Sequence, residues 1–493
     1  MLTTINAEPT LWDAILPEQC LGLPAGLASV DELLNDPVFY VPFVPFFDPD
    51  RGRPSIPMET YIRMMFLKYR YRLGFEPLCR EVADSIAWRR FCRIPLGDNV
   101  PHPTTLMKIT TRCGEAAVAG LNDALLAKAH AAKVVRLDKV RADTTVVEAN
   151  VAYPTDSGLL AKGVARLVVL ITALKAAGYA LRTTTRDRTR SVRARAHSIG
   201  AWLRRRSDNA KTEVYAITAE MTIIAEAAIA DAVAVARNTR RSLRGAGHAA
   251  SGKAAALVAE LEATAQTLGR VCAQTRVRLG GTVPEGSTRI VSLHDRDARP
   301  IAKGRLGKPV EFGYKAQVVD NVDGIVLDHG VVIGNPPDAP MLVPAIERIK
   351  KRFGKAPRVV TADRGYGEAS IDAELENLGV KRVVIPRKGK PGKDRRCVQA
   401  QRGFRRVVKW RTGIEARISC LKRDYGWART LNDGIDGAQT WCAWGVLAHN
   451  SIHIAWLLEQ GPPTPSLDTP RTRPPNRSTD PPPTNTTSPP EPR

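Results

Sequence analysis

The stretch "VVTADRGYGE", residues 359–368, indicates the fold class. Its β-branched run ends on Asp363 and then turns polar. A similar stretch, "VRADTTVVEA" at residues 140–149, carries Asp143 far upstream. Short apolar runs rich in β-branched residues and bounded by polar turns predict buried strands. Two such strands, each presenting an aspartate, suggest that distant parts of the chain meet in one sheet.

Strand and helix signals alternate around the second of these stretches. Residues 309–320 and 324–334 predict a hairpin with a turn at 321–324. A helix is predicted at 339–354, followed by a strand at 357–367, a helix at 369–379 and a strand at 381–388. Residues 389–397 are predicted as a basic loop and 400–424 as helical. This alternation predicts an α/β domain.

The rest of the chain is predominantly helical. Residues 57–74, 75–94 and 102–114 predict three helices, with Thr104 or Thr105 as the cap of the third, and they fit a helix-turn-helix module or a plain helical bundle equally well. Residues 157–280 have almost no strand signal, and two apolar seams predict an antiparallel helical hairpin there. Residues 461–493 consist mainly of Pro, Thr, Ser and Arg and predict a disordered tail.

The composition favours a polyanionic partner. Lys and Arg number 73 against 50 Asp and Glu, so the net charge is +23 and the isoelectric point about 9.9. Nucleic acid is the commonest such partner, and no basic amphipathic anchor supports an acidic membrane surface instead. The apolar run 167–174 is too short to span a bilayer, and no signal peptide is evident. Eight scattered cysteines without a CxxC pair favour a cytoplasmic protein.

A third acidic position lies in "WRTGIEARISCLKRDYG", residues 410–426. Arg411, Glu415 and Lys422 are spaced i, i+4 and i+11, which predicts one shared helix face. Three carboxylates could hold two Mg²⁺ ions, which activate an attacking oxygen and stabilise a leaving one in phosphoryl transfer. The two cations would contact nearby phosphates.

These motifs, together with "YPTDSGLL", "EFGYKAQV" and "GNPPD", resemble bacterial insertion-sequence transposases of the DDE type over residues 30–455. The resemblance implies an RNase H-like core, a mixed sheet flanked by helices, at 131–156 and 281–460. It implies a helical insertion at 157–280 and an all-α DNA-binding region at 1–130. The implied triad is Asp143, Asp363 and Glu415, binding two Mg²⁺ or Mn²⁺ ions. Arg411, Glu415 and Lys422 match the last three letters of the family's YREK signature, whereas Val408 replaces its tyrosine.

The resemblance also implies an activity. A transposase would cut double-stranded DNA at transposon ends and join the freed 3′-hydroxyl to target DNA, as a homodimer or higher oligomer. A structure-selective nuclease on the same fold and a catalytically inactive DNA-binding protein are the rival interpretations. The intact triad argues against the second rival.

Besides Arg411 and Lys422, two groups of residues are candidates for DNA contacts. Thr104, Thr105 and Lys108 lie at helical spacing in the third predicted helix and are the candidate base readers. Arg204, Arg205 and Arg206 close an arginine-rich run at 182–206 that is predicted to contact the DNA backbone, a solvated helix face being the alternative. Four other carboxylates compete for the site: Asp138, Glu148, Asp156 and Asp338. Asp156 and Asp338 lie in loop signals and are interpreted as structural.

Overall fold

The computed structural model describes residues 1–461 except 5–14, 206–207, 245–247, 304–306 and 308. Arg206 and the tail at 462–493 therefore lie outside the described residues. Within the described residues, six strands form one mixed sheet. They are β1 (Lys139–Glu148), β2 (Arg299–Ala302), β3 (Val310–Asn321), β4 (Val326–Ile333), β5 (Val359–Ala362) and β6 (Arg382–Val384).

The strand order places the two predicted aspartate strands side by side. The sheet runs β2-β3-β1-β5-β6, and β4 also pairs with β3. Strand β1 is antiparallel to β3 but parallel to β5, and β5 is parallel to β6. The hairpin of β3 and β4 turns at Gly324, whose φ of +83° lies in the left-handed region that favours glycine. This mixed sheet with its flanking helices confirms the predicted RNase H-like α/β core.

The N-terminal region is helical, as predicted, but its helix boundaries differ. Its main helices are α3 (Ala25–Leu33), α4 (Met58–Tyr71), α5 (Phe75–Asp84), α6 (Ile86–Phe91) and α7 (Pro103–Ala131), after the short α2 (Glu18–Leu21). The predicted helix at 75–94 is two helices, because the Ser85 side chain caps a new helix by accepting from the N–H of Trp88. The predicted cap at Thr104 or Thr105 is wrong: His102 caps α7, and Pro103 occupies its first position. This helix continues past a kink at Gly114.

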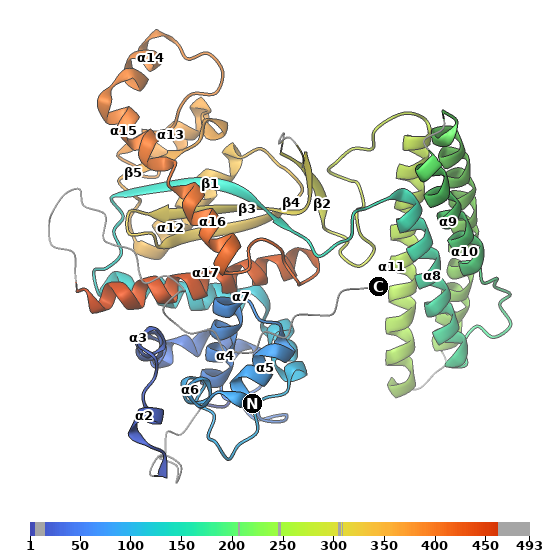
Figure 1. Ribbon diagram of the computed structural model, residues 1–493, viewed down its shortest axis with the longest axis horizontal. Helices are drawn as coiled ribbons and strands as arrows, with labels where there is room; N and C mark the ends of the chain where they lie inside the picture. The colour runs from blue at the N-terminus through green and yellow to red at the C-terminus, as the bar shows by residue number, and fades with distance from the viewer. Residues whose placement is uncertain (5–14, 206–207, 245–247, 304–306, 308, 462–493) are drawn as a thin grey trace.

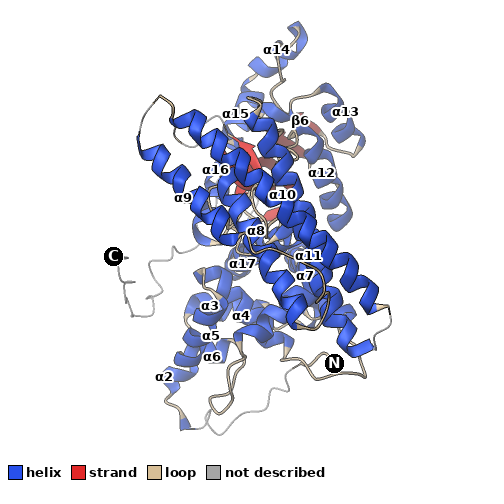
Figure 2. Ribbon diagram, turned by 90° about the vertical axis from the view of Figure 1, so that its right-hand side faces the viewer, coloured by secondary structure: helices blue, strands red, loops and turns tan. Residues whose placement is uncertain are grey.

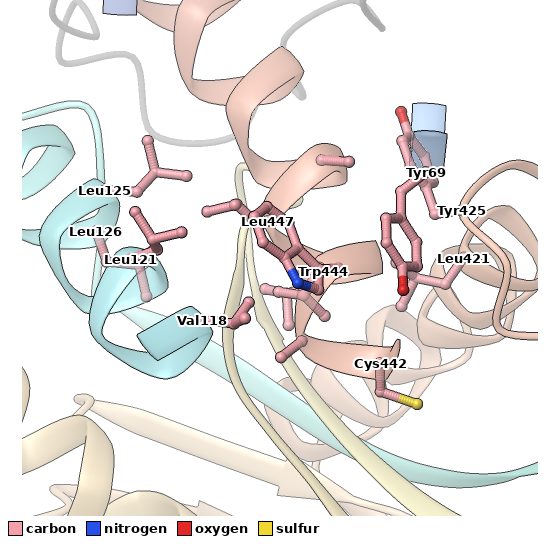
Figure 3. Close-up of a cluster of buried hydrophobic side chains, with 14 of the residues drawn as sticks. Tyr69, Val118, Leu121, Leu125, Leu126, Leu421, Tyr425, Cys442, Trp444 and Leu447 are labelled. Carbon is pink, nitrogen blue, oxygen red and sulfur yellow. The ribbon is translucent and has the colours of Figure 1, made fainter. Parts of the chain in front are cut away.

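The N-terminal helices and the sheet share one hydrophobic core. The last helix, α17 (Gly434–Glu459), lies between them and packs against α4, α7 and β4 (Figure 1). The ring of Trp444 on α17 lies 5.8 Å from that of Tyr61 and 6.2 Å from that of Tyr69, both on α4. Figure 3 shows Trp444 between Tyr69 and the leucines of α7. The surface of α17 is therefore buried by the N-terminal helices on one side and by the sheet on the other.

The predicted helical insertion is a separate bundle with its own core. It consists of α8 (Asp156–Ala176), α9 (Thr189–Arg205), α10 (Ala210–Leu243) and α11 (His248–Leu279), beside the sheet in Figure 1. The predicted hairpin corresponds to α10 and α11, against which α8 and α9 pack. Gly163 is required by close packing, because a Cβ there would lie 2.4 Å from Cδ1 of Leu268.

Helix α8 is the one described helix that is long and apolar enough to cross a membrane. Of its most apolar window, 44% is buried inside the structure. Its buried residues, among them Leu160, Val164 and Leu174, belong to the core of the bundle. A bundle helix with one buried face accounts for this apolarity.

The C-terminal half of the core contains α12 (Ala339–Phe353), α13 (Ala369–Asn377), α14 (Lys393–Ala400), α15 (Arg402–Arg411) and α16 (Ile414–Asp424). Residues 393–397 of the predicted basic loop form the start of α14, so that prediction is wrong. The predicted helix at 400–424 is interrupted at Thr412 and Gly413. There the N–H of Gly413 bonds the carbonyl of Trp410 and the N–H of Glu415 that of Thr412, both i to i+3. Such tight turns rotate the helix by more than the usual 100° per residue.

Candidate active site

Asp143 and Asp363 lie side by side on neighbouring parallel strands. Ala142 on β1 is in register with Ala362 on β5, so each aspartate follows an equivalent position. Adjacent strands are separated by about 4.8 Å. Asp363 directly follows β5 and caps the short 3-10 helix η3 (Arg364–Tyr366), accepting from the N–H of Gly365 at 2.7 Å. The tertiary fold therefore brings together two carboxylates that are 220 residues apart in the chain.

A third carboxylate, Asp338, lies beside this pair. A Cβ placed on Gly365 would be 2.9 Å from Oδ1 of Asp363 and 3.2 Å from Oδ2 of Asp338, so both oxygens border the same small space. Asp338 also accepts from Thr144 Oγ1 at 2.9 Å and pairs with the buried ammonium of Lys315 at 2.6 Å. The interpretation of Asp338 as a structural loop residue therefore omits its position beside the aspartate pair. The strand order could have indicated this position. Strand β4 runs parallel to β1, so the loop after β4, which contains Asp338, lies at the carboxyl edge of the sheet.

The protonated form of Asp143 is favoured by its surroundings. Burial, together with the charges of Asp363 and Asp338, raises the pKa of Asp143 to about 6. The N–H of Thr144, which donates to Oδ1 at 2.8 Å, and the guanidinium of Arg411 oppose this effect. Clustered carboxylates that disfavour a further negative charge are a suitable environment for a hard cation.

Arg411 contacts the first aspartate directly. Its Nη1 lies 3.2 Å from Oδ2 of Asp143, and both side chains are about one-sixth exposed. Arg411 is the last residue of α15. Val408, where the family signature has tyrosine, packs beside Phe404, Val407 and Val384. The position thus serves a small apolar cluster between α15 and β6.

Glu415 does not join the aspartates in this structure. It is exposed in the first turn of α16, and Lys422 lies further along the same helix, half-buried. Within the described residues, no three His, Cys, Asp or Glu side chains are arranged closely enough to hold a metal ion. The predicted single helix face is wrong, because Arg411 ends α15 whereas Glu415 and Lys422 belong to α16. Of the predicted site residues, Asp143, Asp363 and Arg411 are thus brought together. The aspartates fit a divalent cation, and Glu415 would have to approach them.

The candidate DNA-contact residues lie on other elements. Thr104 and Lys108 are exposed at the start of α7, whereas Thr105 is half-buried. Arg204 and Arg205 are exposed at the end of α9, and the guanidinium of Arg205 lies 4.8 Å from the ring centre of Trp202. The competing carboxylate Asp156 has a structural partner, since it pairs with Arg278 at 2.9 Å and links α8 to α11.

The sheet order and its paired aspartates define an RNase H-like α/β protein. Comparison with known families supports a more specific assignment. Residues 19–112 match the family model Transposase domain (DUF772), and residues 282–451 match the Transposase DDE domain. The chain therefore belongs to the insertion-sequence DDE transposases. No curated protein and no solved structure matches it.

Proposed function

We propose that the chain cleaves double-stranded DNA at transposon ends and joins the freed 3′-hydroxyl to target DNA. The observation that carries this proposal is the placement of Asp143 and Asp363 on adjacent parallel strands in a transposase DDE domain. Their carboxylates, with that of Glu415, would hold two Mg²⁺ ions, for which Mn²⁺ could substitute. These ions would lower the pKa of the attacking water and stabilise charge on the leaving oxygen.

The side chains around the aspartates have distinct tasks in this proposal. Asp143 must lose its proton to act as a ligand. With a pKa of about 6, it can do so at neutral pH but not in acid. Arg411 would exchange its contact with Asp143 for a DNA phosphate, to which its planar guanidinium is well matched. Glu415 would complete the ligand set by turning its exposed side chain toward the aspartates once DNA is bound. Lys422 on the same helix would contact a further phosphate.

The remaining basic residues would bind the DNA outside the cleavage site. Thr104, Thr105 and Lys108 would contact the transposon end through the start of α7. Arg204, Arg205 and Arg206 would contact the backbone. We infer a homodimer or higher oligomer on the DNA, because two ends must be joined to one target. We propose that this activity takes place in the cytoplasm, where the DNA of the nucleoid contains both the transposon ends and the target.

The test replaces Asp143 by alanine and measures cleavage of a duplex that carries a transposon end. Loss of one metal ligand should lower the cleavage rate by at least about 100-fold in Mg²⁺. Duplex affinity should stay within about twofold, because most phosphate contacts lie elsewhere. Asp138→Ala is the matched control, since Asp138 is an exposed carboxylate just before β1. Wild-type cleavage by Asp143→Ala would refute the assignment.

A second assay separates the transposase from a structure-selective nuclease. A pre-cut end with a free 3′-hydroxyl is mixed with supercoiled plasmid and wild-type protein. A transposase should join the end to the plasmid, giving a covalent product that migrates with the larger DNA. Cleavage without any joined product would favour the nuclease.

A further inference from the structure

A buried charge cluster lies beside the candidate active site, on the same face of β1. Asp320 on β3 has a fully buried side chain and lies opposite Arg141 on β1. Arg141 holds it in a fork, with Nε at 2.6 Å from Oδ1 and Nη2 at 2.9 Å from Oδ2. Arg417 on α16 adds a second cation, whose Nε lies 3.4 Å from Oδ2. Apolar residues of similar volume often stabilise a core at least as well as such a cluster. Stability alone therefore does not account for it.

Arg141 links this cluster to the junction of α15 and α16. Its third nitrogen, Nη1, donates to the carbonyl of Trp410 at 2.8 Å, and its guanidinium lies over the Trp410 ring at 4.6 Å. A Cβ on Gly413 would lie 2.4 Å from this Nη1. Gly413 has an ordinary φ of −64°, so close approach of the arginine, and not backbone freedom, calls for glycine here.

Arg417 anchors the other side of the junction. Its Nη1 lies 2.6 Å from Nε2 of His449 and 3.5 Å from Nε2 of His453, both on α17. Its Nη2 passes so close to Gly324 that a Cβ there would be 2.1 Å away. Helix α16 is thereby held against the turn between β3 and β4 and against α17.

Residues that the cluster contains or contacts lie one or two positions in sequence from three of the candidate active-site residues. Arg141 precedes Asp143 by two residues, so the two share one face of β1. Trp410 precedes Arg411, and Arg417 follows Glu415 by two residues. One buried carboxylate thus ties β1 to both helices that carry the remaining candidates.

We infer that Asp320, Arg141 and Arg417 form a positioning unit that sets where Arg411 and Glu415 lie relative to Asp143. This inference rests on the proposed DNA cleavage at that site. The three residues touch no reacting atom; they act through the bend at Gly413. A shift of about 1 Å in reacting groups can cost about 100-fold in rate, so such an anchor has a measurable consequence.

The decisive variant is Gly413→Ala in the full chain. Its new Cβ must displace Arg141 from Trp410, so kcat for end cleavage should fall about 10- to 100-fold while KM changes little. Hydrogen exchange of residues 408–418 should become faster. Gly403→Ala is the matched control, because Gly403 lies near the start of α15, where a Cβ would lie 3.3 Å from the flexible end of Arg382. It should leave kcat and exchange unchanged.

A double-mutant cycle tests whether Arg141 transmits the effect. Arg141→Lys keeps a cation beside Asp320 but has no atom at the position of Nη1, so the hydrogen bond to the carbonyl of Trp410 is lost. By itself this variant should lower kcat and speed hydrogen exchange at 408–418. In that background Gly413→Ala should cost little more, because the atom it would meet is gone. Equal losses in both backgrounds, or normal kcat and exchange in Arg141→Lys, would overturn the positioning unit. If the wild type cuts no transposon end, the proposed function is wrong. The positioning unit is then tested by hydrogen exchange of residues 408–418 in the same four proteins.

Discussion

The aspartate pair has an electrostatic cost in the folded protein. Asp143 is mostly buried and lies near two other carboxylates, and Arg411 compensates this only in part. Catalytic sites commonly hold such unfavourable arrangements, which a bound cation then relieves. The same feature predicts how stability depends on this residue and on pH.

Replacement of Asp143 by asparagine should stabilise the metal-free protein at pH 7. The pKa of Asp143 is about 6 when folded and 3.8 as a model value, so the folded state binds more protons between these values. Its contribution to the free energy of unfolding therefore falls as the pH rises through this window. Asp143→Asn removes that loss, which amounts to about 1–3 kcal/mol.

Urea unfolding at several pH values measures this effect. The gain should be present at pH 7 and should vanish below about pH 3, where both folded and unfolded aspartate are protonated. Asp138→Asn, an exposed carboxylate, serves as the control and should change neither value. An equal gain at both pH values would show that the charge of Asp143 is not its cause.

At the scale of single elements, the bundle uses some arginines internally and presents others to solvent. Arg188 pairs with Asp231, and Arg195 pairs with Glu220, which ties α9 to α10. Arg204 and Arg205, by contrast, are exposed at the end of α9. The two groups belong to one arginine-rich run, yet they should respond differently to DNA.

Changing Arg204 and Arg205 together to glutamine should weaken binding to all duplexes alike. Each lost phosphate contact lowers the slope of log K against log salt by about 0.9, so the slope should flatten by about 1.8. Fluorescence anisotropy across a salt series measures it. Arg195→Gln is the control, because its charge is already paired with Glu220. An unchanged slope in the double variant would identify the run as a solvated helix face.

Helix α7 offers a different kind of surface. Leu106 and Ile109 on one side are buried, whereas Thr104, Lys108 and Thr111 are exposed on the other. An exposed polar stripe at the start of a helix is the arrangement by which recognition helices present side chains to base edges.

The double variant Thr104→Ala, Lys108→Ala should lose preference for transposon ends over random DNA. Each base contact contributes about 1–3 kcal/mol of discrimination. Competitive footprinting with the full chain measures the ratio of the two affinities. Lys355→Ala, an exposed lysine in the loop after α12, should leave that ratio unchanged. An unaltered ratio in the α7 variant would place end recognition elsewhere.

At the scale of the whole molecule, the described residues form two large, separate hydrophobic cores. One is shared by the N-terminal helices, the sheet and α17, and the other lies within the bundle of α8 to α11. Figure 2 shows the bundle from the side that faces away from the sheet in Figure 1. This division bears on which parts of the chain can fold alone.

A fragment of residues 155–281 should fold cooperatively, whereas a fragment of residues 1–130 should not. The second fragment would expose Tyr61 and Tyr69, which pack against Trp444 in the full chain. Thermal unfolding followed by circular dichroism should be sigmoidal only for the bundle. The N-terminal fragment should bind a hydrophobic dye and aggregate. A folded, monomeric N-terminal fragment would contradict the shared core.

The amino-acid sequence by itself determined the strands β1 and β5, their aspartates and most helices, because β-branched runs, glycine stops and charge spacing are local signals. It also indicated the RNase H-like core and the bundle. Only the tertiary structure decided that Asp338 borders the aspartate pair, that α17 joins the N-terminal helices to the sheet, and that the helix bends at Gly413. Each of these depends on side chains from distant segments, such as Arg141 beside Gly413, whose close approach no local pattern encodes.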